Sequence, residues 1–144
     1  MRIKFYPQEF PRKSEILNIL QKYKHFLPWW ANEVLISNVA PEDDDDSAGA
    51  SCTHQKHYRR IAIQLSIRNI EGLDLSDLLL HEICHSYNEA LNDAVEAIIP
   101  LYVDGKRDQK IVTELLDRRV EEQTEDLCIM LTKLVEHIEN KGVN

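Results

Sequence analysis

Residues 81–85 read HEICH, in which two histidines four positions apart flank a glutamate. Side chains four apart on a helix lie on the same face, so His81 and His85 point to one place, as two zinc ligands must. Zinc lowers the pKa of a water that it binds, and the neighbouring carboxylate of Glu82 can take that proton. The spacing therefore predicts a Zn2+ site with Glu82 as general base. The alternative is a pair of solvated or hydrogen-bonded histidines on a surface helix.

The residues around this motif favour a helix that presents the histidines away from its apolar side. Asp74 or Ser76 can cap the helix at its start. Its expected apolar face consists of Leu79, Leu80, Ile83 and Tyr87. This face is expected to hold the helix against the core while the two histidines point elsewhere.

A catalytic zinc usually takes a third protein ligand and keeps one position open. Position 91, where a third histidine or an aspartate would extend the motif, is a leucine. The segment RRVEEQTEDLC at 118–128 offers three glutamates instead, Glu121, Glu122 and Glu125. Glu122 and Asp126 are one helical turn apart, so one carboxylate can bind the metal while the other accepts a hydrogen bond from a ligand histidine.

The helical phase of this segment favours Glu122 over Glu121. The expected core stripe consists of Val120, Leu127, Leu131 and Leu134. At about 100° per residue, Glu122 and Asp126 then fall beside apolar residues, whereas Glu121 falls on a solvated face. The apolar neighbours are Leu115, Ile129 and Met130. An apolar surround suits a partly buried metal ligand and is costly for a bare carboxylate, so Glu122 is the predicted third ligand.

HEICH followed by EEQTED resembles the gluzincin metallopeptidases in a minimal one-domain form, a minigluzincin. The strand IAIQLSI ahead of LLLHEICH is also similar to that family, and the resemblance spans residues 14–135 in element order. It implies a zincin-like domain with IAIQLSI as the edge strand that pairs with an extended substrate. It also implies zinc held by His81, His85 and Glu122, with Glu82 as base. Asp126 would then be the hydrogen-bond partner of a ligand.

Hydrophobic periodicity predicts one α+β domain over 1–144, in which a short sheet packs on helices. Alternating apolar residues predict strands within 1–7, 32–40 and 59–69. Helical spacing predicts helices over 14–27, from 74 onward, and from 108 to about 140, with a break at Pro100. The acidic stretch at 41–56 is expected to be a flexible solvated loop, with a calcium site as the alternative.

The composition of the chain argues against some classes of binding partner and indicates a cellular compartment. The chain has 144 residues and a formal charge of −8, which argues against nucleic-acid binding because that affinity comes mostly from Lys and Arg on phosphates. Three cysteines without a CxxC pair fit a reducing compartment. The sequence contains neither an apolar signal core nor an apolar run of membrane-spanning length. We therefore expect a cytoplasmic protein without a membrane partner, whose oligomeric state stays open.

These features together predict a zinc-dependent metallopeptidase that hydrolyses bonds in a peptide or protein substrate. The alternative is a metallopeptidase-like binding or regulatory domain that retains zinc but has no general proteolytic activity. A third possibility is a protein whose acidic loop masks the cleft. The intact Glu82 favours an enzyme. The oxyanion-stabilising residue stays open among Tyr58, Tyr87, Tyr102, His54 and His57.

Overall fold

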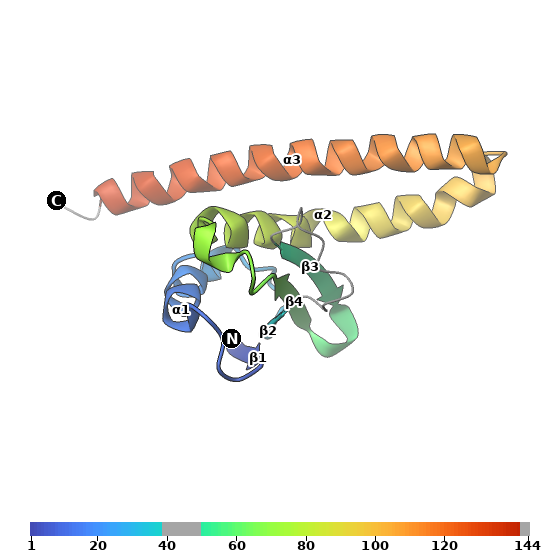
Figure 1. Cartoon of the computed structure of the whole chain (residues 1–144). Coiled ribbons are helices and arrows are strands. Elements are labelled where there is room, and N and C mark those ends of the chain that lie inside the picture. Colours follow the sequence, from blue (N-terminus) through green and yellow to red (C-terminus); the bar gives the residue numbers. More distant parts are fainter. Residues whose placement is uncertain (39–49, 142–144) are drawn as a thin grey trace. The chain divides into compact units, whose positions relative to one another are not determined.

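A computed structural model describes residues 1–38 and 50–141 and contains a four-stranded sheet and three α-helices (Figure 1). The chain forms two compact units, Met1–Ser86 and Tyr87–Asn144. The α+β class is confirmed. The expectation of a single zincin-like domain over 1–144 stays a prediction. The two units are described in turn.

The sheet of the first unit has the strand order β1-β2-β4-β3. Strands β1 (Arg2–Tyr6), β2 (Glu33–Asn38) and β4 (Arg60–Leu65) are parallel, and β3 (Ala50–Gln55) is antiparallel to β4. The register aligns apolar residues across the parallel strands, so that they share one face of the sheet. The aligned sets are Ile3, Val34 and Ile61, and then Phe5, Ile36 and Ile63.

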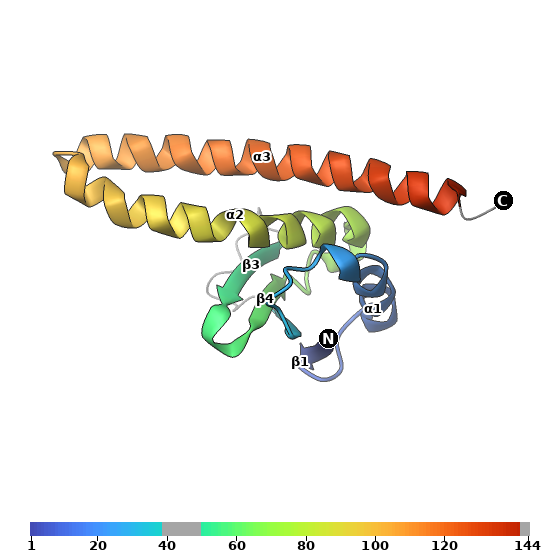
Figure 2. The same cartoon turned by 180° about the vertical axis from the view of Figure 1, so that it is seen from behind.

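Two helices cover this apolar face. Helix α1 (Lys13–Lys22) contributes the buried Ile16 and Leu20, and the first turns of α2 (Leu75–Tyr102) contribute Leu79 and Ile83. The Tyr23 hydroxyl lies 3.1 Å from Ser76 Oγ. The end of α1 therefore lies close to the start of α2 (Figure 2). The β1–α1–β2 crossover therefore places its helix on the same side of the sheet as the start of α2, which follows β4.

Two sequence predictions about strands are wrong. Residues 50–55, predicted as part of the flexible loop, form β3, because their backbone pairs along the whole of β4. The strand IAIQLSI is consequently internal, with β2 on one side and β3 on the other, and it is not the predicted edge. The edges of the sheet are β1 and β3. Residues 41–49 of the predicted loop lie outside the described residues.

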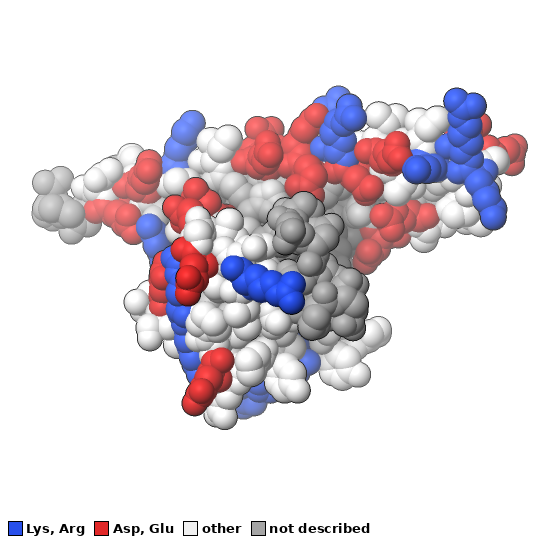
Figure 3. All heavy atoms as spheres, in the orientation of Figure 1, with Lys and Arg blue, Asp and Glu red and all other residues white. Residues whose placement is uncertain are grey.

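The second unit is an antiparallel helical hairpin. Helix α2 continues through Pro100 to Tyr102, so the predicted break at Pro100 is wrong and the turn follows at 103–105. Gly105 has a φ of 86°, a left-handed conformation that suits glycine, and α3 then runs from Lys106 to Lys141. Acidic and basic side chains are interspersed along α3 (Figure 3). None of the helices in the described ranges has the length and apolarity needed to cross a membrane.

Candidate metal site

The helix that carries HEICH begins at a well-defined cap. Asp74 Oδ1 accepts hydrogen bonds from the backbone N–H groups of Ser76 at 2.9 Å and Asp77 at 3.3 Å. These bonds satisfy two of the amide donors that a helix leaves unpaired at its start. Of the two caps that the sequence allows, Asp74 is the one used. The register of the motif on α2 is therefore fixed from its first turn.

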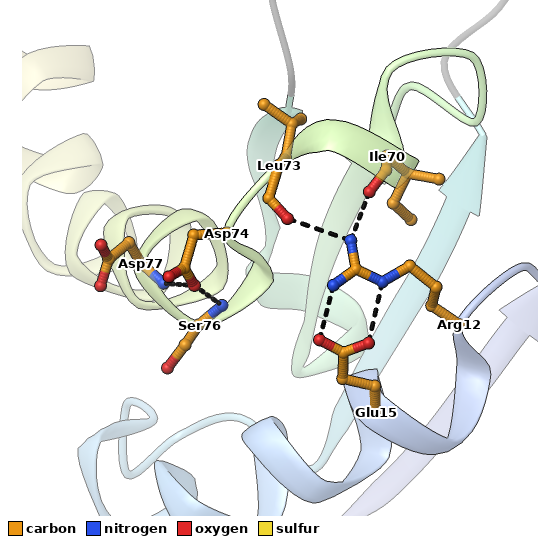
Figure 4. Close-up of polar contacts among 7 residues, drawn as sticks. All are labelled: Arg12, Glu15, Ile70, Leu73, Asp74, Ser76 and Asp77. Atoms are coloured by element: carbon orange, nitrogen blue, oxygen red, sulfur yellow. Dashed lines mark hydrogen bonds and ion pairs between the residues drawn. The ribbon is translucent and has the colours of Figure 1, made fainter.

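The chain segment just before this cap is held by Arg12 (Figure 4). Its guanidinium donates to the backbone carbonyls of Ile70 and Leu73, and it also forms a two-pronged ion pair with Glu15 at 2.8 and 2.6 Å. Arg12 itself has a left-handed φ of 52°. One side chain at the start of α1 thus fixes the entry of the chain into α2.

Around the motif, α2 buries the residues that the sequence assigned to its apolar face, with one exception. Leu79, Leu80 and Ile83 are buried, and so is Cys84 inside the motif. Tyr87 is 47% exposed, so its placement on the core face was wrong. The two histidines are half-buried, as expected for side chains at the margin of the core.

The imidazole rings of His81 and His85 converge. Their Nε2 atoms are 2.9 Å apart, and the rings meet edge to face with centroids 4.6 Å apart. Two explanations fit this distance. One neutral ring can donate a hydrogen bond to the other, or both nitrogens can be directed at one cation. Because imidazole nitrogens bind zinc as neutral acceptors, the second arrangement needs both Nε2 atoms unprotonated.

The spacing of the two nitrogens is compatible with zinc. Two ligand nitrogens about 2.0–2.1 Å from a tetrahedral zinc lie roughly 3.3 Å from each other. The observed 2.9 Å is a few tenths of an ångström shorter, which a small rotation of either ring would correct. The donor set is also of the type that zinc prefers. The role of both histidines as metal ligands stays a prediction.

Glu82 is the buried acid of the motif, with only 4% of its surface exposed. A carboxylate is rarely this buried unless something compensates the loss of hydration. Its position next to His81 on α2 places it about 100° round the helix from that ligand candidate. A buried carboxyl group on the same helical turn as two converging imidazoles is a combination that acid–base chemistry can use.

The surroundings of Glu122 on α3 differ from those expected. Its carboxylate accepts a 2.6 Å bond from Arg119 one turn earlier, and half of its side-chain surface is exposed. The three expected apolar neighbours, Leu115, Ile129 and Met130, are each more than half exposed. The predicted partly buried apolar surround of Glu122 is therefore wrong. Asp126 is also exposed. The ligand role of Glu122 and the supporting role of Asp126 stay predictions.

The error lies in the helical phase of α3. Leu134, assigned to the core stripe, is 44% exposed, whereas Thr124 is fully buried. At about 100° per residue, Glu121 lies about 60° from Thr124 round the helix, and Glu122 lies about 160° from it. Glu121 therefore borders the buried side of α3, and Glu122 lies on the opposite side.

A partly buried polar contact in the hairpin was not predicted from the sequence. Asn88 Nδ2 donates to Thr124 Oγ1 at 3.1 Å, which joins α2 to α3 within the second unit. Neither residue type signals burial, so periodicity alone could not find the contact. Four polar residues on α2 do share one helical face at spacings of four, three and four: His81, His85, Asn88 and Asn92. That spacing was the available signal.

Comparisons with protein family models, curated proteins and solved structures give no match for this chain.

Proposed function

We propose that the chain is a zinc-dependent metallopeptidase of the gluzincin type. Support comes from one observation above the others: the His81 and His85 Nε2 atoms converge to 2.9 Å on the helix in which the buried Glu82 follows His81. When bound, zinc would supply Lewis-acid chemistry, polarising a peptide carbonyl and acidifying water. His81 and His85 would hold it through Nε2. Glu82 would accept the proton of the attacking water and deliver it to the leaving amine.

A carboxylate of α3 would complete the ligand set. The sequence favours Glu122 through its E-x-x-x-D spacing with Asp126, while the phase of α3 favours Glu121. One oxygen of the Glu122 carboxylate already accepts a 2.6 Å bond from Arg119, which leaves only its other oxygen for a metal. We therefore propose Glu121 as the first candidate for the third metal ligand and Glu122 as the second.

The first test measures zinc and peptide cleavage together. Purified protein is loaded with zinc, dialysed and assayed for bound metal, and it is then incubated with a mixture of unstructured peptides whose products are read by mass spectrometry. We expect about one zinc per chain, and loss of that zinc in His81→Ala and His85→Ala. Glu82→Gln should keep the zinc and cleave at least a hundredfold more slowly, because an amide cannot take the proton.

Three results would count against the enzyme. Absence of zinc from the wild type would remove the metal site and with it the proposed activity. Zinc binding without any cleavage would support the alternative, a zinc-retaining binding or regulatory domain. Equal cleavage by wild type and Glu82→Gln would show that the activity comes from elsewhere in the preparation.

The second test decides between the two glutamates. Glu121→Ala and Glu122→Ala are compared by zinc affinity under the same conditions, with Glu125→Ala as a matched control on the same helix. We expect Glu121→Ala alone to lose most of the affinity. Asp126→Ala should weaken zinc binding by roughly ten- to a hundredfold if Asp126 orients a ligand. Loss of zinc in Glu122→Ala with retention in Glu121→Ala would instead restore the E-x-x-x-D assignment.

A further inference from the structure

The free edge of β1 borders a groove that is separate from the HEICH motif. The groove has a volume of about 700 Å3 and lies between β1 and α1. Its lining residues are Ile3, Lys4, Phe5, Tyr6, Pro7, Gln8, Lys13 and Leu17. Two lysines and no carboxylate belong to this set. The groove therefore combines an apolar lining with positive charge in a protein of net charge −8.

The backbone along this groove can accept another strand. Arg2 donates its N–H to the Asn32 carbonyl at 2.8 Å, so the peptide groups of Arg2 face β2. Successive residues of a strand turn their N–H and C=O groups to opposite edges, so those of Lys4 also face β2. The N–H and C=O groups of Ile3 and Phe5 then point to the open edge, because β1 ends the sheet on this side.

Lys13 gives the groove its charge. It is the first residue of α1, and its Nζ lies 4.9 Å above the centre of the Phe5 ring. The same ammonium donates to the Gln8 carbonyl at 3.0 Å. An ammonium has three N–H donors, so it can still bind a carboxylate that enters the groove. The other lysine of the groove, Lys4, forms a 2.6 Å ion pair with Glu33, which neutralises much of its charge.

We propose that this groove binds an extended peptide segment rich in acidic residues, which adds to the sheet alongside β1. The free peptide groups of Ile3 and Phe5 would pair with the backbone of the segment, the mode called β-augmentation. Apolar side chains of the segment would contact Phe5 and Leu17, and an acidic one would reach Lys13. A sheet edge presents unpaired N–H and C=O groups on which another extended segment can pair.

The test uses two short capped peptides, one alternating glutamate with valine and the other alternating lysine with valine. Binding to the full chain is measured by fluorescence anisotropy at low and at physiological salt. We expect the glutamate peptide to bind more tightly than the lysine peptide, with an affinity that falls as salt rises. Lys13→Glu should lower the affinity for the glutamate peptide by roughly fivefold to tenfold and raise the affinity for the lysine peptide.

The charge reversal has a matched control and should not disturb the fold. A carboxylate in the first turn of a helix is favourable, so α1 should tolerate Lys13→Glu, which a thermal melt checks. Lys24→Glu makes the same change in charge at an exposed lysine outside the groove. If Lys24→Glu lowers the affinity for the glutamate peptide as much as Lys13→Glu does, the attraction depends only on the net charge of the protein and the proposal fails.

Amide hydrogen exchange supplies a second readout. The peptide should slow exchange at Ile3 and Phe5, whereas Lys4, already paired with β2, should change little. Equal changes at all three amides, or none, would place the peptide elsewhere and overturn the proposal. Slower exchange at Ile3 and Phe5 when protein concentration rises without peptide would show that a second copy of the chain occupies the edge, which would also overturn it.

Discussion

At the scale of the residue, Glu33 holds two cations on the sheet face opposite the helices. Its carboxylate accepts bonds from Lys4 Nζ at 2.6 Å and from Arg60 Nε at 2.5 Å, and only 9% of the residue is exposed. The hydrogen bond from Lys4, followed by the one from Arg60, holds the pKa of Glu33 below its ordinary value. A carboxyl group with a lowered pKa in the folded state stabilises the fold above its unfolded pKa of about 4.3.

We predict that Glu33 contributes to acid sensitivity. As pH falls from about 5 through the lowered folded pKa, Glu33 takes up a proton more readily in the unfolded chain, and its stabilising contribution is lost. Glu33→Gln should therefore unfold more easily at neutral pH and lose less stability on acidification. Urea melts at several pH values measure this, with the exposed Glu9→Gln as control. Parallel pH curves for wild type and Glu33→Gln would contradict the prediction.

The two halves of the candidate site differ in how far the sequence could predict them. His81 and His85 belong to one helix, and the i,i+4 rule is local, so their convergence needs no knowledge of the fold. The choice between Glu121 and Glu122 depends on which face of α3 is buried. That face includes Thr124, which pairs with Asn88, and no hydrophobic pattern marks a buried threonine. Apolar residues occur on both sides of α3 in the sequence. The predicted core stripe included Leu134, which is exposed, and left out Thr124, which is buried.

At the scale of the element, the strands that alternate clearly were predictable, whereas β3 was not. Ile61, Ile63 and Leu65 on β4 are all fully buried, as their alternation predicts. Strand β3 has the sequence ASCTHQ, which lacks a run of large apolar side chains. It becomes a strand because its backbone pairs with β4, a tertiary cause that local propensity does not record.

The cap of α2 gives a prediction about how one element positions another. Arg12 donates hydrogen bonds to the backbone carbonyls of Ile70 and Leu73, ahead of Asp74. Arg12→Ala removes both hydrogen bonds and should destabilise the start of α2. We expect a fall in melting temperature of several degrees. Arg12→Gly should lose less than Arg12→Ala, because glycine suits the φ of 52° at this position. Thermal melts compare both with Arg118→Ala, an exposed arginine on α3. An order in which Arg12→Gly is the less stable variant would mean that backbone strain at residue 12 is unimportant.

At the scale of the whole molecule, the buried apolar residues are divided unequally between the two units. Seventeen of the twenty buried apolar residues in the described ranges belong to Met1–Ser86. The second unit contributes only Ile99, Leu131 and Val135. Regions with few buried apolar contacts open at lower free energy than the core. The long helix α3 is thus expected to be the less stable part of the chain.

This asymmetry makes zinc a selective stabiliser if the proposed ligand set is right. Without metal, we expect the amides in the middle of α3 to exchange faster than those of β4. Zinc at one hundred times its dissociation constant should then slow exchange in α3 by up to about a hundredfold, because opening that removes a ligand must release the metal. The amides of β4 should change much less, since the core already protects them. Hydrogen exchange read by mass spectrometry, with and without zinc, measures the difference.

Glu121→Ala serves as the control because it keeps the hairpin and removes the favoured α3 ligand. In that variant, zinc should no longer slow exchange in α3, while Glu125→Ala should respond like the wild type. Two patterns would speak against the prediction. Equal protection of α3 in Glu121→Ala would mean that this glutamate does not bind the metal. Protection confined to the first turns of α2 would mean that His81 and His85 hold zinc without any carboxylate from α3. Such a two-histidine site would be too weak to stabilise the long helix, and the metallopeptidase proposal would then need a different third ligand.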